Sequence, residues 1–263
     1  MFAIALLASI GCTEPTGGPA PGAQAPTVAP PPLRVMTYNV NYGIAGDAET
    51  LAVIADEDAD VVLLQETTEA WEAALRSSLG ARYPHLGFHH CCGAGGLGVL
   101  SKVPFDAYEV LAPPDGGWFP AWRVVIRTQA GDLQALNVHL RPQLSESGSF
   151  LGGVFTTPAV RRAEIEAYFP ALDRELPTIV AGDFNENGRG GAIRFLEDTG
   201  WSTAVPAASG ATPTWRWQTS IGEIREQLDH VVVDPRIEVL DVRVVERGRS
   251  DHLPVVATIR VRT

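Results

Sequence analysis

The sequence predicts an α/β (α+β) domain in which two β-sheets pack face to face and helices cover the outside. Short apolar segments typical of strands outnumber the segments with helical periodicity, and turn residues separate them. Apolar residues make up 45% of the chain and charged residues 19%, which provides a sizeable core and excludes disorder for the body of the chain. We find no internal repeat and no linker inside this body.

Strands are predicted where β-branched and apolar residues alternate or run together, and helices where apolar residues recur every three to four positions. The predicted strands are residues 33–40, 60–65, 96–101, 107–111, 121–128, 133–140, 177–181, 228–233, 239–246 and 255–261. The predicted helices are residues 47–57, 69–79, 158–168 and 192–197. A turn at residues 130–132 joins two strands as a hairpin, and Pro158 stands near a helix start, where proline is tolerated.

Residues 1–12 are predicted to be an export signal and not part of the fold. Their apolar run is too short for a bilayer, which needs about 20 residues. Cys12 follows the run directly, as in a bacterial lipoprotein signal, where this cysteine is lipidated and tethers the protein to the membrane. A plain secretion signal with an incidental cysteine is the alternative, because no Lys or Arg precedes the run and Ser9 replaces the usual Leu. We therefore expect an exported protein, either membrane-anchored or secreted.

Residues 13–32 consist almost entirely of Pro, Gly, Ala and Thr and cannot form a core. We expect them to be a tether that reaches about 25 Å as a flexible coil and about 60 Å when extended. Residues 33–263 then form the functional domain. Its loops include residues 141–157, a connection long enough to suggest a functional role.

Charge and cysteine content restrict the classes of function. The formal net charge of -11 disfavours non-specific binding to nucleic-acid backbones. The run His89-His90-Cys91-Cys92 suggests a Zn²⁺ cluster, but consecutive residues rarely surround one ion, so we favour a structural loop.

Polar side chains gather at the ends of the predicted apolar strands. These residues are Asn39, Glu66, Asp183, Asn185, Asp229, His230, Asp251 and His252, while Asn137 and His139 project from one face of their strand. Each could be a local cap or turn. Taken together, buried carboxylates need a partner or a cation, and this donor set suits Mg²⁺, with Mn²⁺ as the alternative.

Seven segments, read in order, resemble the endonuclease/exonuclease/phosphatase superfamily of DNase I-like metal-dependent phosphoesterases. They are Thr-Tyr-Asn-Val-Asn at 37–41, Leu-Gln-Glu at 64–66, Gly-Val-Leu-Ser-Lys-Val-Pro at 98–104, Asn-Val-His-Leu at 137–140, Gly-Asp-Phe-Asn at 182–185, Leu-Asp-His-Val at 228–231 and Ser-Asp-His-Leu-Pro-Val at 250–255. The resemblance runs from about residue 33 to 262. It implies a four-layer α/β sandwich, with two mainly antiparallel sheets between outer helices and a phosphate site at one edge.

The resemblance also implies residue roles. Glu66 would be the principal Mg²⁺ ligand, with Asn39 beside it and Asp251 nearby. Asp183, helped by Asn185, would orient or deprotonate the attacking water. The resemblance further implies that His252 contacts the phosphate and that Asp229 fixes the tautomer of His252. It implies that Asn137 and His139 donate hydrogen bonds to the phosphate oxygens. Whether His252 or Asp183 is the base stays open, and attack is in line without a covalent enzyme intermediate.

The substrate class is an open expectation. A phosphate ester is implied, from nucleic acid, a nucleotide or a lipid head group, and no protein partner is expected. Loop candidates for base stacking are Trp118, Trp122, Trp215, Trp217 and Arg141, which could equally be core residues. Phe150, Leu151, Val154 and Phe155 would be the membrane-contacting loop of a lipid-directed phosphodiesterase. A non-catalytic binding module on a tether is a further alternative.

Overall fold

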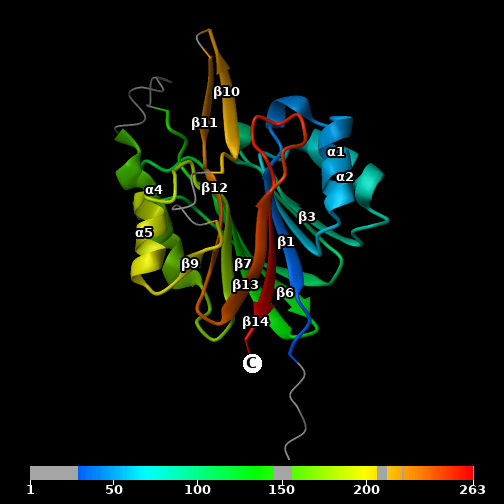
Figure 1. Cartoon of the computed structure of the whole chain (residues 1–263), viewed down its shortest axis with the longest axis vertical. Helices are drawn as coiled ribbons and strands as arrows, with labels where there is room; N and C mark the ends of the chain where they lie inside the picture. The colour runs from blue at the N-terminus through cyan, green and yellow to red at the C-terminus, as the bar shows by residue number, and fades with distance from the viewer. Residues whose placement is uncertain (1–28, 145–155, 206–211, 221, 263) are drawn as a thin grey trace, which may run out of the picture.

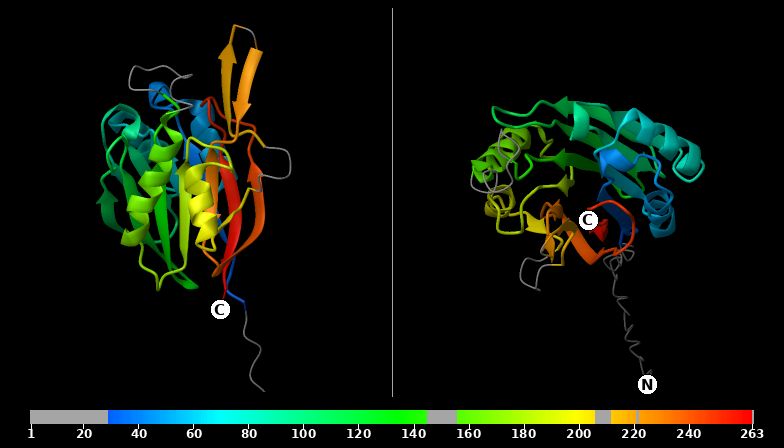
Figure 2. Two further views of the ribbon diagram at one scale, coloured as in Figure 1. Left: turned by 90° about the vertical axis from the view of Figure 1, so that its left-hand side faces the viewer. Right: turned by 90° about the horizontal axis from the view of Figure 1, so that it is seen from above.

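The structure is a computed structural model that describes residues 29–144, 156–205, 212–220 and 222–262. The predicted export signal and most of the predicted tether lie outside these residues. Figure 1 shows two sheets in the middle of the molecule, with α1 (Ala48–Glu57) and α2 (Glu69–Leu79) on one side and α4 (Pro158–Tyr168) and α5 (Gly191–Asp198) on the other. The view from above in Figure 2 shows the same order of layers. The predicted two-sheet α/β fold is confirmed.

Each sheet has six strands. The first runs in the order β13 (Ile237–Val244), β14 (Val255–Val261), β1 (Leu33–Asn39), β2 (Val61–Gln65), β4 (Leu97–Ser101) and β3 (His85–His89). The second runs β5 (Phe105–Leu111), β6 (Ala121–Thr128), β7 (Gly131–His139), β8 (Thr178–Asp183), β12 (Asp229–Val233) and β9 (Ser202–Thr203). A separate hairpin of β10 (Trp215–Thr219) and β11 (Gly222–Glu226) projects beyond the top of the sheets in Figure 1.

Alternation along the strands builds the core in layers. In β1, Val35 packs between the two sheets, whereas Met36 and Tyr38 pack under α1 and α2. In β8, Ile179 faces the other sheet and Val180 faces α4 and α5. Successive strand residues point to opposite faces, so two apolar faces per strand are needed where a sheet lies between a second sheet and a helix layer.

The two sheets share one arrangement that positions the site. Most neighbouring strands are antiparallel, but β1 pairs with β2 in parallel and β7 pairs with β8 in parallel. These two pairs lie in the middle of their sheets, and all four strands end at the same edge of the sandwich. The carboxyl ends of parallel strands are the usual place for a ligand site.

The sequence predicted the large elements and missed four small strands. Every predicted helix and strand is present, with bounds shifted by a few residues at most. The missed strands are β3, β9, β10 and β11. β3 is partly exposed at a sheet edge and rich in His. The β10–β11 hairpin lies outside the core, with Trp and Arg alternating at the start of β10 and three charged residues in β11. A strand that buries little apolar surface leaves a weak sequence signal.

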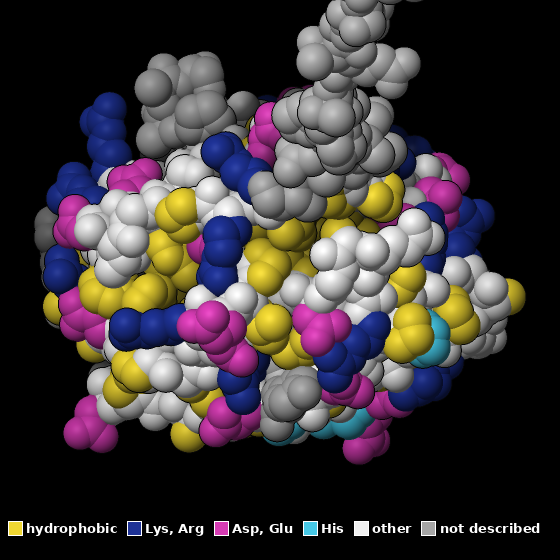
Figure 3. All heavy atoms as spheres, turned by 90° about the horizontal axis from the view of Figure 1, so that it is seen from below, with side chains coloured by type: hydrophobic (Ala, Val, Ile, Leu, Met, Phe, Trp, Pro, Cys, Tyr) yellow, Lys and Arg dark blue, Asp and Glu magenta, His cyan; other side chains and the backbone are white. Residues whose placement is uncertain are grey.

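The end of the sandwich opposite that edge carries a small hollow of about 170 Å³. Pro31, Leu33, Val103 and Ile259 are among its lining residues, and Figure 3 shows apolar side chains at this end of the molecule. Asp60 is the one ionisable residue among those that line it, so the hollow offers little for catalysis. Within the described part of the chain, no helix is long and apolar enough to cross a membrane.

Candidate functional site

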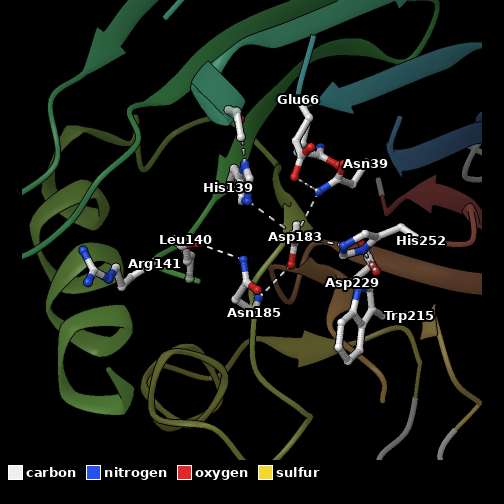
Figure 4. Close-up of polar contacts among 12 residues, drawn as sticks. Asn39, Glu66, His139, Leu140, Arg141, Asp183, Asn185, Trp215, Asp229 and His252 are labelled. Atoms are coloured by element: carbon white, nitrogen blue, oxygen red, sulfur yellow. Dashed lines mark hydrogen bonds and ion pairs between the residues drawn. The ribbon is translucent and has the colours of Figure 1, made fainter. Parts of the chain in front are cut away.

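Four parallel strands deliver four polar residues to one edge. Asn39 ends β1 and Glu66 follows β2, while His139 ends β7 and Asp183 ends β8. Strand register then fixes the neighbours, because Asp183 pairs with His139 on one side and with Asp229 on the other. Figure 4 shows these side chains converging from both sheets.

The converging residues line a cavity of about 610 Å³. Its lining residues are Tyr42, Glu66, Ala94, Trp118, Phe119, His139, Pro142, Gln143, Leu144, Asp183, Asn185, Trp215, Trp217, Leu228, Asp251 and His252. Of the predicted site residues, Glu66, His139, Asp183, Asn185, Asp251 and His252 reach the cavity directly. We call the ionisable residues Glu66, His139, Asp183, Asp251 and His252 the cavity cluster.

Asn39 links the two sheets beneath the cavity. Its Nδ2 donates to Glu66 Oε1 at 3.0 Å and to Asp183 Oδ2 at 3.1 Å. Its Oδ1 accepts from the Asn41 backbone N–H at 3.1 Å. The buried amide therefore holds two carboxylates from different sheets at one spot.

Asp251 is held at the rim by Asn41, which we did not predict as a site residue, and by Trp215, which we predicted only as a candidate for base stacking. Asn41 Nδ2 donates to Asp251 Oδ1 at 2.8 Å, and Trp215 Nε1 donates to Asp251 Oδ2 at 3.1 Å. Asn41 lies in the matched segment at residues 37–41, which was its one sequence signal. The Trp215 indole belongs to the projecting hairpin, whose pairing was not readable from the sequence.

His252 lies between two aspartates. Its Nδ1 is 2.9 Å from Asp229 Oδ2, and its Nε2 is 3.5 Å from Asp183 Oδ2. Burial alone lowers the pKa of His252, but Asp229 and Asp183 together outweigh burial and raise this pKa to about 10. At neutral pH the side chain is therefore an imidazolium.

The carboxylates of the cavity are costly to ionise. Burial raises the pKa of Asp183, with Asp229 adding to the effect and the imidazoles of His252 and His139 opposing it. Burial also raises the pKa of Glu66, against the hydrogen bonds from Asn39 and the Tyr42 backbone. For both carboxyl groups, the nearby hydrogen bonds and imidazoles do not offset the cost of burying a negative charge.

His139 is oriented by a backbone carbonyl. Its Nδ1 is 3.1 Å from the oxygen of Ala94, and its Nε2 is 3.5 Å from Asp183 Oδ2. The ring also packs against Phe119, with the centroids 4.5 Å apart. Because Nδ1 donates to a carbonyl, Nε2 is the nitrogen that faces the cavity. Burial lowers the pKa of His139, with Asp183 opposing it.

Backbone conformations that non-glycine residues rarely adopt also gather here. The described non-glycine residues with positive φ are Asn41, Asp58, Glu66 and Asn185, and three of these four are at the site. Asn185 is stabilised in this conformation, because its N–H donates to Asp183 Oδ1 and its Nδ2 to the oxygen of Leu140. Such strain persists where the surrounding structure holds it, often at functional sites.

A second group of buried charges lies next to the cavity, and we call Arg141, Arg161, Glu164 and Glu186 the arginine cluster. Arg161 Nε lies 3.3 Å from Glu186 Oε2, and Arg161 Nη1 donates to the oxygen of Arg141 at 3.2 Å. Glu164 Oε2 accepts the Arg141 backbone N–H at 2.8 Å. Arg161 therefore connects the segments that follow β7 and β8.

Glu186 joins this cluster to the start of α5. Its carboxylate accepts the backbone N–H groups of Ala192 at 2.7 Å, Ile193 at 3.0 Å and Gly191 at 3.1 Å. A carboxylate before the first turn of a helix is favourable for the unpaired N–H groups there. Glu186 follows Asn185 directly, so this contact also fixes the loop that carries Asn185.

The donor set around the cavity fits a hard divalent cation. Glu66, Asp183 and Asp251 all line it, and none of the described lining residues is Lys or Arg. Burial raises the pKa of Glu66 and Asp183, and a bound cation would stabilise their charged forms. The three ligand atoms that lie within 4.8 Å of one another belong to Asp183, Asp229 and His252. Since the imidazole stands between those two aspartates, Glu66 and Asp251 are the carboxylates of the cavity better placed to hold a cation.

Asn137 does not take the place expected for a phosphate contact. Its Nδ2 donates to the backbone oxygens of Leu64 at 3.0 Å and Gly98 at 3.1 Å, and its Oδ1 accepts from Gln65 Nε2 at 2.7 Å. The side chain is fully buried and does not line the cavity. With both amide hydrogens used, Asn137 instead links the second sheet to the first.

The structure also describes residues 89–92 and His230. His89, His90, Cys91 and Cys92 do not form a metal cluster among the described residues, because His90 pairs with Glu72 and both cysteines are free. His230 points away from the site and contacts the oxygen of Glu186. The structural loop that we favoured for residues 89–92 agrees with these contacts.

The tryptophans divide between core and rim. Trp122 is a core residue between the sheets, whereas Trp118, Trp215 and Trp217 line the cavity. Arg141 stacks on Trp118 with its guanidinium carbon 3.4 Å from the ring centroid and does not line the cavity. The loop proposed for membrane contact, with Phe150, Leu151, Val154 and Phe155, lies outside the described residues.

A match to a known protein family covers most of the chain. Residues 36–252 match the sequence model described as the Endonuclease/Exonuclease/phosphatase family. No curated protein sequence matches the chain.

Solved structures share the fold at low sequence identity. The crystal structure of an endonuclease/exonuclease/phosphatase from Beutenbergia cavernae aligns with a TM-score of 0.66 and 24% identity, covering 88% of this chain and 72% of that one. The human Nocturnin catalytic domain with a bound sulfate anion aligns with a TM-score of 0.63 and 18% identity, over 89% and 96% of the two chains. A humanized D. rerio TDP2 aligns with a TM-score of 0.64 and 15% identity, over 88% and 99%.

Proposed function

Because this chain belongs to the Endonuclease/Exonuclease/phosphatase family, we propose that it is a Mg²⁺-dependent phosphodiesterase acting on single-stranded nucleic acid or nucleotides. The observation that carries the proposal is the cavity itself. Carboxylates from both sheets face one space, no described Lys or Arg lines that space, and an imidazolium stands beside it. A bound Mg²⁺ would polarise a phosphoryl oxygen and neutralise developing charge there.

The geometry favours Asp183 over His252 as the base. An imidazolium with a pKa of about 10 has no free lone pair at neutral pH, so His252 serves better as a positive charge near the phosphate. Asp183 lies within 3.5 Å of two imidazoles, and its raised pKa makes it a stronger proton acceptor than an ordinary aspartate. Asp183 would accept a proton from water, while the His252 imidazolium stabilises charge on the phosphate oxygens. Because His139 Nδ1 donates to Ala94, Nε2 of His139 could donate to the phosphate only when this ring is protonated.

Aromatic side chains at the rim favour a nucleic-acid substrate. Tyr42 is 54% exposed and Trp217 is 46% exposed, and both line the cavity that contains Asp183. Exposed rings of this kind stack on bases, with about 1–3 kcal/mol per base. The net charge of -11 disfavours duplex binding, which depends on many phosphate contacts. Unpaired bases close to the scissile phosphate fit both observations.

The first test is hydrolysis of bis(p-nitrophenyl) phosphate and of p-nitrophenyl phosphate, each with Mg²⁺ and with a chelator. We expect Mg²⁺-dependent turnover with preference for the diester. The next substrates to test are single-stranded DNA, RNA, sphingomyelin and inositol phosphates. If Trp217 stacks on a base, Trp217→Ala should raise KM for single-stranded DNA about tenfold. Turnover that survives the chelator, or faster cleavage of sphingomyelin than of single-stranded substrates, would contradict the proposal.

Export and membrane attachment are a separate part of the proposal. Cys12 lies outside the described residues, and the support is the apolar run before it and the Pro-rich stretch after it. Growth with a radiolabelled fatty acid should mark the wild-type chain and not a Cys12→Ala variant. Equal labelling of both would exclude lipidation of Cys12.

A further inference from the structure

The adjacent cysteines lie on the loop between β3 and β4, next to the cavity wall. Cys92 is exposed, Cys91 is partly exposed, and neither forms a disulfide. A Cβ atom added to Gly95 would be 3.3 Å from each of the two Sγ atoms, so both sulfurs face the same buried glycine. A hydrogen bond with the Cys91 thiol, together with burial, raises the pKa of Cys92 to about 11. The two thiols are thus direct neighbours.

The same loop contacts His139, the last residue of β7. The carbonyl of Cys92 accepts the Gly95 N–H at 3.0 Å, and this turn presents the Ala94 oxygen to His139 Nδ1. Gly95 also lies against Phe119, because an added Cβ would be 2.8 Å from the Phe119 ring. Phe119 in turn packs on the imidazole of His139. A change at Cys92 therefore reaches His139 through a carbonyl and through a ring.

We propose that Cys91 and Cys92 are a site of reversible oxidation, and that their disulfide displaces His139 in the cavity. The oxidant is a low-molecular-weight disulfide. The thiolate of one cysteine attacks the oxidant, forms a mixed disulfide with one half of it and releases the other half as a thiolate. The second cysteine then loses its proton to solvent and attacks the mixed disulfide, which releases the remaining half as a second thiolate. The pair loses two electrons and two protons, and the oxidant becomes two thiols. The catalytic consequence rests on the proposed function, but the oxidation does not.

The geometry of neighbouring residues makes this oxidation a conformational event. Consecutive Cα atoms are about 3.8 Å apart, whereas disulfide-linked residues are usually about 4.4–6.8 Å apart. The backbone at residues 91–92 must rearrange to close the bond, and the Cys92 carbonyl belongs to that backbone. Exposed disulfides under strain are the labile ones, which suits a reversible site.

The test uses the full chain with Cys12→Ala, in which Cys91 and Cys92 are the remaining cysteines. Reduced protein is treated with glutathione disulfide and followed by thiol titration, intact mass and ¹⁵N resonances of His139, assigned with His139→Gln. We expect loss of both thiols without an adduct, a shift of the His139 resonances and a fall in kcat of about 10- to 100-fold. Dithiothreitol should reverse all three changes.

The matched control is Cys91→Ser/Cys92→Ser, which keeps two small hydroxyls but can form neither the bond nor an adduct. Under the same treatment it should keep its His139 resonances and its kcat. A glutathione adduct or a dimer in place of the internal disulfide would overturn the site, and an internal disulfide that leaves His139 unchanged would overturn the coupling. If the chain cleaves no phosphodiester, the proposed function fails. The intact mass and the His139 resonances still test the oxidation and its effect on His139.

Discussion

Two groups of buried charges lie side by side at one edge of the sandwich, and they differ in how the charges are balanced. In the arginine cluster, Arg161 lies against Glu186, and three backbone N–H groups complete the carboxylate's hydrogen bonds. In the cavity cluster, carboxylates from two sheets face a space with no described basic side chain other than histidine. The arginine cluster holds positive and negative side chains together, although burial still raises the pKa of Glu164 and Glu186, whereas the described lining of the cavity includes no Lys or Arg. The paired charges of the arginine cluster fix loops, and under the proposed function the carboxylates of the cavity cluster would bind a cation.

The largest effect is expected from Asp183→Asn. The amide keeps the size of the side chain but cannot accept a proton from water, so kcat should fall by about 10²–10⁴-fold. The free energy of unfolding should change by no more than about 2 kcal/mol. Rates on bis(p-nitrophenyl) phosphate and urea unfolding measure the two quantities.

The control for this variant is Asp234→Asn, at the opposite end of β12. Asp234 is as buried as Asp183, accepts the Thr178 N–H at 2.7 Å and pairs with Arg236 at 2.6 Å. This change should lower stability and leave kcat unaltered. A near wild-type rate for Asp183→Asn would remove this side chain from the chemistry.

The next effect is on stability, and it concerns the arginine cluster. Arg161→Ala leaves Glu186 buried without its guanidinium partner, so the free energy of unfolding should fall by about 3–5 kcal/mol. Arg162→Ala removes the neighbouring but exposed pair with Glu166 and should cost less than about 1 kcal/mol. Equal losses in both variants would show that the arginine cluster is not held together by the paired charges described above.

A smaller effect separates the two clusters by their response to metal. Mg²⁺ at about 100 times its Kd should stabilise the protein by about 2.7 kcal/mol, seen as a raised Tm, and a chelator should reverse it. Glu66→Gln should abolish this rise, because one ligand charge is lost. Glu164→Gln, in the arginine cluster, should retain it, and loss of the rise in both variants would place the metal elsewhere.

The smallest effect is a difference in pH dependence of stability in metal-free protein. Burial raises the pKa of Glu164 from 4.5 to about 7, so its stabilising contribution is complete below pH 4.5 and is lost as pH rises through 7. Asp229 and Asp183 raise the pKa of His252 from 6.5 to about 10 against the effect of burial. Its contribution is therefore complete below pH 6.5 and is lost as pH rises through 10.

The two windows can be separated by variants. Glu164→Gln should flatten the stability profile between pH 4.5 and 7, and His252→Gln should flatten it between 6.5 and 10. Chemical unfolding at a series of pH values measures both profiles. If each variant flattened the other window, the assignment of charges to the clusters would be wrong.

Much of the fold and part of the site could be predicted from the sequence. Buried strands such as β2 and β8 are continuous apolar runs, and the polar residues that end them, Glu66 and Asp183, stand out against those runs. Asn137 shows the limit of this reasoning. Alternation placed it on the same strand face as His139, but the neighbouring sheet takes up its hydrogen bonds. A side chain's partners across an interface between sheets leave no mark in its local sequence.

The supporting contacts were missed for the same reason. Arg161 and Glu186 are 25 residues apart, and their pairing depends on how α4 packs beside the end of β8. Glu186 had a weak signal, since an acidic residue shortly before a helix is favourable at the helix start. Ala94 had none, because a backbone carbonyl that orients His139 can belong to any residue type.

The cavity and the hydrogen bonds beneath it take Asn39, Glu66, Asp251 and His252 from one sheet and its surroundings, and His139, Asp183 and Asp229 from the other. A ligand bound between them resists any sliding of one sheet over the other. Neither sheet alone holds all of these groups. Ligand affinity would therefore decline in mild denaturant as soon as the sheets begin to separate, before either sheet loses its own hydrogen bonds.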